Sequence, residues 1–206
     1  MRLKYRASGV CAKSLRTCAS HCVLLLLAGA STARAQQARG IDIKIDPATT
    51  VIHWTLGDVL HTVRGTFKLK SGLVHLYPET GAVTGSVVVD ATSGESGNSM
   101  RDQVMHSKIL ESSRYPTITF LPRHLNSKFD PNQEQALTVD GMLNLHGQDH
   151  PLQLTVRVHP ASGPITLNTH FTVPYVQWGL KDPSTFVLRV DKDVSIDIEA
   201  TAQLKP

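Results

Sequence analysis

The residues best suited to chemistry are an adjacent pair of opposite charges, Arg101 and Asp102. A guanidinium group holds a phosphate through two parallel hydrogen bonds, so Arg101 is a candidate contact for a phosphorylated headgroup. The pair can instead fasten its own segment to the body of the fold, and the sequence favours this structural interpretation. The sequence alone leaves both roles of Arg101 open.

Histidines are the second group of interest. The chain has ten, and nine of them follow His21. Four occupy polar positions of expected strands, where neighbours across a sheet are able to bind a metal ion: His53, His146, His159 and His170. No H-x-H or H-E-x-x-H spacing is present. Solvated surface histidines are therefore the favoured interpretation, and neither a metal nor another cofactor is expected.

Motifs for nucleophilic catalysis are missing from the sequence. The G-x-S-x-G motif is absent. The acidic pair Asp191 and Asp193 falls near an expected turn and indicates solubility. The three cysteines, Cys11, Cys18 and Cys22, all lie in a segment that we expect to be removed. We therefore predict a protein without catalytic residues that is not an enzyme.

The first 35 residues have the features of a secretory signal peptide. Five basic residues and no acidic residue precede an apolar run over 22–30, and Ala33-Arg34-Ala35 fits the small-x-small rule for cleavage. The apolar run is far shorter than the roughly 20 residues of a membrane-spanning helix. We expect cleavage near Ala35 to leave a periplasmic or secreted domain over 36–206, without a transmembrane segment.

The charge of the expected mature chain argues against a nucleic-acid partner. The full chain has 21 Lys and Arg against 17 Asp and Glu, a net charge of +4. Six basic and no acidic residues lie in the first 35, so the remainder has 15 against 17, a net charge of −2. Nucleic-acid phosphates are bound by clustered Lys and Arg. The 171 residues that remain suffice for one domain with a sizeable core.

Apolar and polar residues alternate along most of this domain. A period of two is typical of strands with one buried and one wet face. We expect at least seven strands among eight alternating segments, around 51–56, 62–70, 86–90, 117–120, 137–145, 152–158, 165–173 and 194–201. Turn residues such as Ser71-Gly72 and Ser162-Gly163-Pro164 separate them, and a turn over 146–149 predicts a hairpin between 137–145 and 152–158.

One segment, 98–114, lacks this period. The spacing of Met100, Val104, Ile109 and Leu110 is closer to that of a short helix. Asn98 or Ser99 can cap its start, and Pro116 disfavours helix at the residue before it. We predict one helical excursion that folds over a mouth of the β structure.

The apolar strand faces need a partner, either a second sheet or the interior of a barrel. Aromatic residues make up only 5% of the chain, so few large groups are available to fill a barrel. Four glycines in or near strands, Gly65, Gly85, Gly141 and Gly179, either leave further space or mark bulges. A cavity and a solid interior both remain open on this evidence.

The order of several short motifs resembles the YceI-like family of lipid- and polyisoprenoid-binding proteins, over roughly residues 41–204. The similarity rests on the following pieces: Asp46-Pro47, the strand with Ile52, Trp54 and Leu56, His61 to Phe67, Ser86 to Asp90, Arg101-Asp102, Leu110-Glu111-Ser112, Tyr115-Pro116-x-Ile118-x-Phe120, Val139 to Gly147, and Gln177-Trp178-Gly179. Two segments depart from the family pattern, the glycine-rich 92–100 and the Gln177-Trp178-Gly179 turn.

The resemblance implies an all-β fold, an extended eight-stranded antiparallel lipocalin-like barrel with one short helical excursion, and a polyisoprenoid or similar long amphiphile in its interior. Binding, transport or storage of that lipid is the expected function. The apolar tunnel is expected to be lined by Trp54, Phe67, Leu69, Val87, Val89, Phe120, Leu143, Leu145, Leu154, Val156, Phe171 and Trp178. The alternatives are a stress-related interaction protein with a solid core and, less favoured, a His-dependent metalloenzyme. Oligomeric state and lipid identity do not follow from the sequence.

Overall fold

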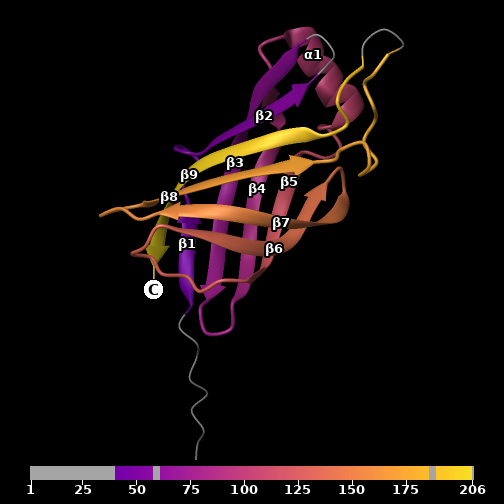
Figure 1. Ribbon diagram of the computed structural model, residues 1–206. Coiled ribbons are helices and arrows are strands. Elements are labelled where there is room, and N and C mark those ends of the chain that lie inside the picture. Colours follow the sequence, from indigo (N-terminus) through magenta and orange to yellow (C-terminus); the bar gives the residue numbers. More distant parts are fainter. Residues whose placement is uncertain (1–39, 58–60, 186–188, 206) are drawn as a thin grey trace, which may run out of the picture. The chain divides into compact units, whose positions relative to one another are not determined.

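The computed structural model describes residues 40–57, 61–185 and 189–205. The predicted signal peptide lies outside these residues. The described chain forms strands β1 (Ile41–Ile45), β2 (Val51–Gly57), β3 (Thr62–Tyr77), β4 (Ala82–Glu95), β5 (Thr117–Leu125), β6 (Gln135–Leu145), β7 (Gln148–His159), β8 (Ile165–Val173) and β9 (Val194–Lys205), with one helical segment between β4 and β5 (Figure 1).

The strands close into an antiparallel barrel with eight positions. The hydrogen-bonded order is β1-β3-β2-β9-β8-β7-β6-β5-β4, and pairing of β3 with β4 closes the ring. β1 and β2 both lie between β3 and β9, β1 beside residues 72–76 of β3 and β2 beside residues 62–67. The two short strands therefore share one position, and the predicted eight-stranded barrel is confirmed.

The predicted alternation sets which side chains face inward. Along β6, Leu137, Gly141, Leu143 and Leu145 are buried, and the other residues between Leu137 and Leu145 are more exposed. The inner faces form two separate packed clusters. One contains Leu76, Val83, Leu125, Leu137, Val158, Ile165 and Ala202, and the other contains Leu143, Leu145, Val173, Tyr175 and Leu180. The apolar positions of the alternating strands therefore form the core of the barrel.

The longest strands, β3 and β4, bend through bulges. Their register shifts between Thr66 and Lys68 and again between Leu69 and Ser71. Gly85 of β4 has a φ of 105°, and a Cβ there would lie 2.2 Å from the Leu73 carbonyl oxygen. Only glycine fits a positive φ at so close an approach. The pairing of β4 with β5 shifts register between Ala82 and Val87, so Gly85 marks a bulge, one of the two roles left open for it.

The predicted hairpin of β6 and β7 is confirmed, with a tighter turn than expected. His146 and Gly147 have φ values of 54° and 76°, as a two-residue type I′ turn requires. Gln148 pairs with Leu145 and Asp149 with Asn144, so these two residues belong to β7. The expected four-residue turn over 146–149 was wrong because His146 tolerates the left-handed conformation.

The helical excursion is also shorter than predicted. Helix α1 (Ser99–Val104) begins after Asn98, whose side chain accepts a hydrogen bond from the Arg101 amide, so the capping prediction for Asn98 is confirmed. A π-helical turn, η1 (Met105–Ile109), continues it. Residues 110–114 form turns instead of helix. Within the described residues, no helix has the length and apolar character to cross a bilayer.

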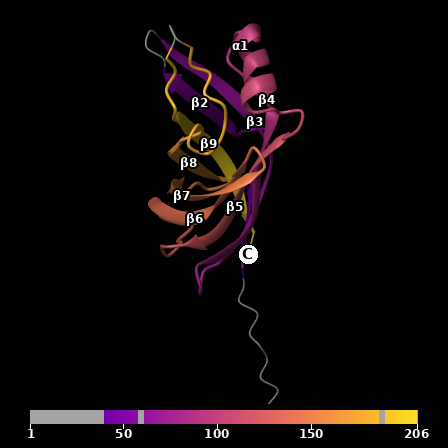
Figure 2. The same ribbon diagram turned by 90° about the vertical axis from the view of Figure 1, so that its right-hand side faces the viewer.

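The connection between β8 and β9 comprises residues 174–193, of which the structure describes 174–185 and 189–193. β7 and β8 pair only between Val156–His159 and Thr166–Thr169, so their other ends diverge. The connection lies at the same end of the barrel as α1 in both views (Figures 1 and 2). Long connections without regular structure are commonly functional. This end of the barrel is therefore the place to examine.

Candidate functional site

The barrel interior contains an apolar cavity of about 500 Å³. This volume lies within the range of small-molecule binding pockets. Every strand contributes to its wall, and so do α1 and η1. Among the described residues that line it, only Trp54, Arg101, Thr169 and Tyr175 carry an N–H or O–H group on the side chain. The cavity is therefore suited to a hydrocarbon and has few groups to direct a reaction.

The cavity exists because some inward-facing side chains of the barrel do not fill the interior. Val87 and Val89 of β4 and Val156 of β7 line it, yet these inward-facing valines are only half-buried. In a filled core such residues would be fully buried, since protein interiors are close-packed. A solid interior, the alternative left open by the sequence, is not what the structure has.

Ten of the twelve residues predicted to form the apolar tunnel line the cavity: Trp54, Phe67, Val87, Val89, Phe120, Leu143, Leu145, Leu154, Val156 and Phe171. The other two lie outside its wall. Leu69 is buried on β3 next to the bulge that disturbs its register with β4. Trp178 stacks on His150, with ring centroids 4.3 Å apart and planes 2° from parallel.

The glycines do not create the empty space. A Cβ at Gly65 would lie 2.4 Å from the Trp54 ring, and one at Gly141 would lie 2.6 Å from the Phe120 ring. The two glycines therefore let these aromatic rings approach the backbone of a neighbouring strand closely.

Two polar residues fasten the helical segment to β4. Oδ1 of Asp102 accepts hydrogen bonds from the Ser96 amide and hydroxyl, at 2.9 and 2.5 Å. One ring nitrogen of His106 lies 2.8 Å from the Gly94 carbonyl oxygen, and the other lies 2.9 Å from the Ser112 hydroxyl. Ser112 is buried, with 5% of its surface exposed. The motif pieces Arg101-Asp102 and Leu110-Glu111-Ser112 thus meet in one polar attachment.

Arg101 and Asp102 have different surroundings. The two roles considered for the pair, contact with a headgroup and attachment of the helical segment, can therefore be weighed for each residue separately. Asp102 holds the segment in place, as the structural interpretation expected. Arg101 lines the cavity and is also exposed to solvent. Within the described part of the chain, its guanidinium forms no ion pair. A cation at the edge of an apolar cavity is positioned to meet an anionic headgroup.

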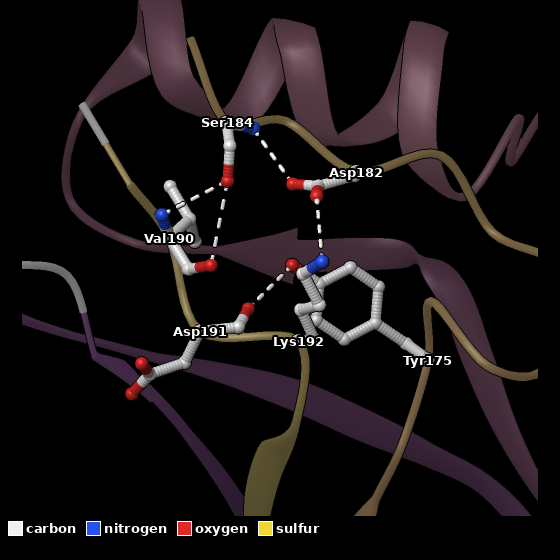
Figure 3. A network of polar contacts seen from close by, with 6 residues as sticks. All are labelled: Tyr175, Asp182, Ser184, Val190, Asp191 and Lys192. Carbon is white, nitrogen blue, oxygen red and sulfur yellow. Dashed lines mark hydrogen bonds and ion pairs between the residues drawn. The ribbon is translucent and has the colours of Figure 1, made fainter. Parts of the chain in front are cut away.

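The two arms of the 174–193 connection are joined to each other beside the cavity (Figure 3). The Tyr175 hydroxyl donates to the Asp191 carbonyl oxygen at 2.7 Å, and the Val190 amide donates to Oγ of Ser184 at 3.0 Å. An ion pair links Lys192 to Asp182 at 3.8 Å. Tyr175, Pro183 and Val190 also line the cavity, so this polar network shapes its wall.

Burial of Tyr175, with smaller contributions from the negative charges of Asp182, Asp191 and Asp193, raises the pKa of its hydroxyl to about 12. The hydroxyl therefore remains a hydrogen-bond donor at any physiological pH. At Asp182, hydrogen bonds from Ser184 lower the pKa of the carboxyl group, so this group is the anionic partner of Lys192 at neutral pH.

Several cavity residues were not predicted from the sequence. Thr169 occupies an inward position of β8 between Leu167 and Phe171, so strand alternation could have found it. Val104, Met105 and the residues of the 174–193 connection had no such signal, because neither segment follows the strand period. Their place in the wall comes from tertiary packing alone.

Two polar atoms in the wall residues have no hydrogen-bond partner, Nε1 of Trp54 and Oγ1 of Thr169. Both are buried, and an unsatisfied buried group of this kind costs about 1–3 kcal/mol.

Among the described residues, no three or more His, Cys, Asp or Glu side chains lie close enough together to bind a metal ion. His170 instead lies 2.7 Å from Asp197, and His159 lies 3.3 Å from Glu134.

Solved structures with this fold have low sequence identity to the chain. BcnA of Burkholderia cenocepacia has a TM-score of 0.62 and 17% identity, over 77% of this chain and 99% of that one. A polyisoprenoid-binding domain of Saccharophagus degradans, implicated in plant cell wall breakdown, has a TM-score of 0.59 and 13% identity, over 79% and 98%. A Campylobacter jejuni YceI protein has a TM-score of 0.58 and 19% identity, over 71% and 88%.

The comparison with curated proteins gave no match. The YceI-like domain model matches residues 43–202, which span the barrel from β1 to β9. The family expected from the sequence motifs is thereby confirmed, and the chain belongs to the YceI-like domain family.

Proposed function

We propose that the barrel binds the hydrocarbon chain of a polyisoprenoid or similar long amphiphile in its interior and catalyses no reaction. The observation that carries this proposal is the almost entirely apolar cavity of about 500 Å³ in the barrel interior. Each methylene group removed from water contributes roughly 0.8 kcal/mol. A long chain therefore binds tightly without many directional contacts.

The family and its structural relatives support the class of ligand. The chain belongs to the YceI-like family, and a relative of the same fold is described as a polyisoprenoid-binding domain. The polar end of the ligand would lie at Arg101, the one charged side chain among the described residues of the cavity wall. Bidentate hydrogen bonding makes a phosphate or diphosphate the headgroup that this guanidinium fits best.

The compartment forms part of the proposal. We propose that the signal peptide over 1–35 is cleaved near Ala35 and that the domain over 36–206 acts in the periplasm or outside the cell. N-terminal sequencing of the protein from a cell-envelope fraction tests this. A chain that keeps residues 1–35 and stays in the cytoplasm would contradict it.

Native purification, organic extraction and mass spectrometry test the lipid directly. Wild-type protein is expected to release a prenyl lipid, or to take up an added polyprenol in a one-to-one complex. Val156→Trp, which places a large ring in the cavity, should abolish uptake. Thr155→Trp is the matched control, because Thr155 is exposed on the opposite face of β7.

The control variant should bind as the wild type does, and both variants should keep the far-ultraviolet spectrum of the barrel. A folded wild-type barrel that yields no lipid and takes up no polyprenol would refute the proposal. Equal uptake by Val156→Trp and the wild type would place the ligand outside the cavity.

A further inference from the structure

The outer side of the helical segment α1–η1 carries an apolar and basic surface next to the cavity. Met100 is 75% exposed and does not line the cavity, and Val104 is 48% exposed. The two residues are four apart on α1, so they share one face of the helix. The docking surface, as we call it below, consists of Met100, Arg101, Val104 and Lys108.

The charges of this surface have one sign. The exposed side chains of α1 and η1 are Ser99, Met100, Arg101, Gln103, Val104, Ser107 and Lys108, so they include two cations and no anion. Asp102, the acidic residue of the segment, is half-buried and accepts hydrogen bonds from Ser96. A surface with exposed apolar groups and lysine or arginine is complementary to an anionic lipid surface.

The docking surface is continuous with the cavity wall. Arg101 and Val104 are exposed and also line the cavity, and Met105 and Ile109 extend the same wall inward. An amphiphile that leaves a membrane at this surface would meet the cavity without crossing a polar region of the protein. The two observations together indicate where a lipid enters.

We propose that the α1–η1 segment docks on the surface of a membrane that contains anionic lipids and presents the cavity mouth to the bilayer. This inference rests on the proposed function, since a membrane surface is useful to a barrel that takes up lipid. Met100 and Val104 contribute apolar contact, and Arg101 and Lys108 contribute attraction to the headgroups. The mode of binding is peripheral, with the barrel itself in water.

Flotation with vesicles tests the docking. The purified domain is mixed with vesicles of phosphatidylcholine alone, or of phosphatidylcholine with an equal part of phosphatidylglycerol. Wild-type protein should float with the anionic vesicles and much less with the neutral ones. Lys108→Gln should lower the partition coefficient about fivefold, because one basic residue near an anionic surface contributes about 1 kcal/mol.

Met100→Asp should lower partition further, by about tenfold or more, since it removes apolar contact and adds a negative charge. Leu73→Asp is the matched control, because Leu73 is an apolar residue of β3 with 44% exposure that does not line the cavity. It should float as the wild type does. Uptake of a prenyl lipid from anionic vesicles should slow in Met100→Asp and Lys108→Gln.

Affinity for a short, water-soluble prenyl alcohol separates this inference from the proposed function. Met100 and Lys108 do not line the cavity, so both variants should bind the alcohol with wild-type affinity. Wild-type protein that binds the alcohol but floats with neither kind of vesicle would overturn the docking and leave the proposed function intact. Equal flotation of Met100→Asp and wild type would also overturn it, and so would a surface that binds a protein partner and no vesicle.

Discussion

At the scale of single residues, Arg101 is the proposed contact for an anionic lipid headgroup. Its guanidinium has no ion-pair partner in the described chain and lies in an otherwise apolar wall. The carboxylate of its neighbour Asp102 instead accepts hydrogen bonds from Ser96. Of this adjacent pair, Arg101 is therefore available to contact a ligand, and Asp102 holds the helical segment in place.

Replacing Arg101 should change headgroup preference more than total affinity for hydrocarbon. Hydrogen bonds to a charged group contribute about 1.5–3 kcal/mol, so Arg101→Gln should weaken binding of farnesyl diphosphate about tenfold or more. Binding of farnesol should change little. Competition against a fluorescent lipid in vesicle-free buffer measures both affinities.

Lys108→Gln is the control for this loss, because Lys108 lies on the same segment but outside the cavity wall. An equal loss for farnesyl diphosphate in both variants would mean that net charge, and not contact with Arg101, sets the preference.

Tyr175 gives stability a predicted dependence on alkaline pH. The hydroxyl has a pKa of about 12 in the folded protein and about 10 in an unfolded chain. The folded state thus holds the proton more tightly, and its contribution to stability is complete below pH 10. It decreases as the pH rises from 10 towards about 12, at up to about 1.4 kcal/mol per pH unit.

Urea unfolding of wild type and Tyr175→Phe at several pH values above 8 checks this dependence. The variant should be less stable by about 1 kcal/mol near neutral pH, because the Asp191 carbonyl oxygen loses its donor. The difference should shrink as the pH approaches 12. A stability difference that grows with pH would contradict the prediction that the raised pKa of Tyr175 stabilises the folded state only below about pH 12.

At the scale of elements, the attachment of α1–η1 depends on side chains more than on helix propensity. A helical segment of this length is marginal on its own. Asp102 and His106, four residues apart, both bind the end of β4. The segment should therefore detach when these contacts are removed, although the barrel remains closed.

Asp102→Ala is expected to lower amide-exchange protection over 99–109 and to leave the strands protected. Loss of the carboxylate leaves the Ser96 amide without its acceptor, at a cost of about 1–3 kcal/mol. Gln103→Ala is the control, since Gln103 is exposed on the same helix. Unchanged protection over 99–109 in Asp102→Ala would contradict the attachment.

The bulge in β4 is a second element with a strict residue requirement. Gly85→Ala should destabilise the barrel by several kcal/mol, because it combines a φ of 105° with a Cβ 2.2 Å from a carbonyl oxygen. Gly163→Ala should be nearly neutral, because no atom lies within 4 Å of the added carbon. Thermal unfolding of the two variants compares them, and equal melting temperatures would refute the assignment.

The elements also show what could be predicted from the sequence. Strands such as β6 and β8 were predictable because alternation is a local signal. Nine inward residues of the wall, from Phe67 to Phe171, could be named for the same reason. The C-terminal part of β4, after residue 90, was not expected to be a strand, because the glycines and serines of 92–97 are typical of a loop. The shared position of β1 and β2 is a tertiary feature and had no local signal.

Predictions failed for residues whose packing does not follow the alternation of the strands. Trp178 was placed at the tunnel by composition, yet its ring stacks on His150. Leu69 has the parity of an inward residue, but the adjacent bulges in β3 alter the register around it. Val104 and Tyr175 belong to the wall because segments distant in sequence meet at one end of the barrel.

At the scale of the whole molecule, the barrel combines two packed clusters with an apolar cavity. The cluster around Leu76, Val158 and Ala202 provides core stability at one level. The second cluster, around Leu143 and Tyr175, supports the end that carries the helical segment and the 174–193 connection. Residues of both clusters line the cavity, and other wall residues such as Val87 and Val156 are only half-buried, which is the arrangement that a bound hydrocarbon would complete.

The central claim is that this interior binds one prenyl chain by burying its hydrocarbon, and a titration with prenyl alcohols of increasing length tests it most directly. Calorimetry should give one ligand per barrel and a negative heat-capacity change, the mark of apolar burial. Affinity should rise with each added isoprene unit until the cavity is full, and then level off. A folded barrel whose affinity is independent of chain length, or that binds none of the alcohols, would contradict the account.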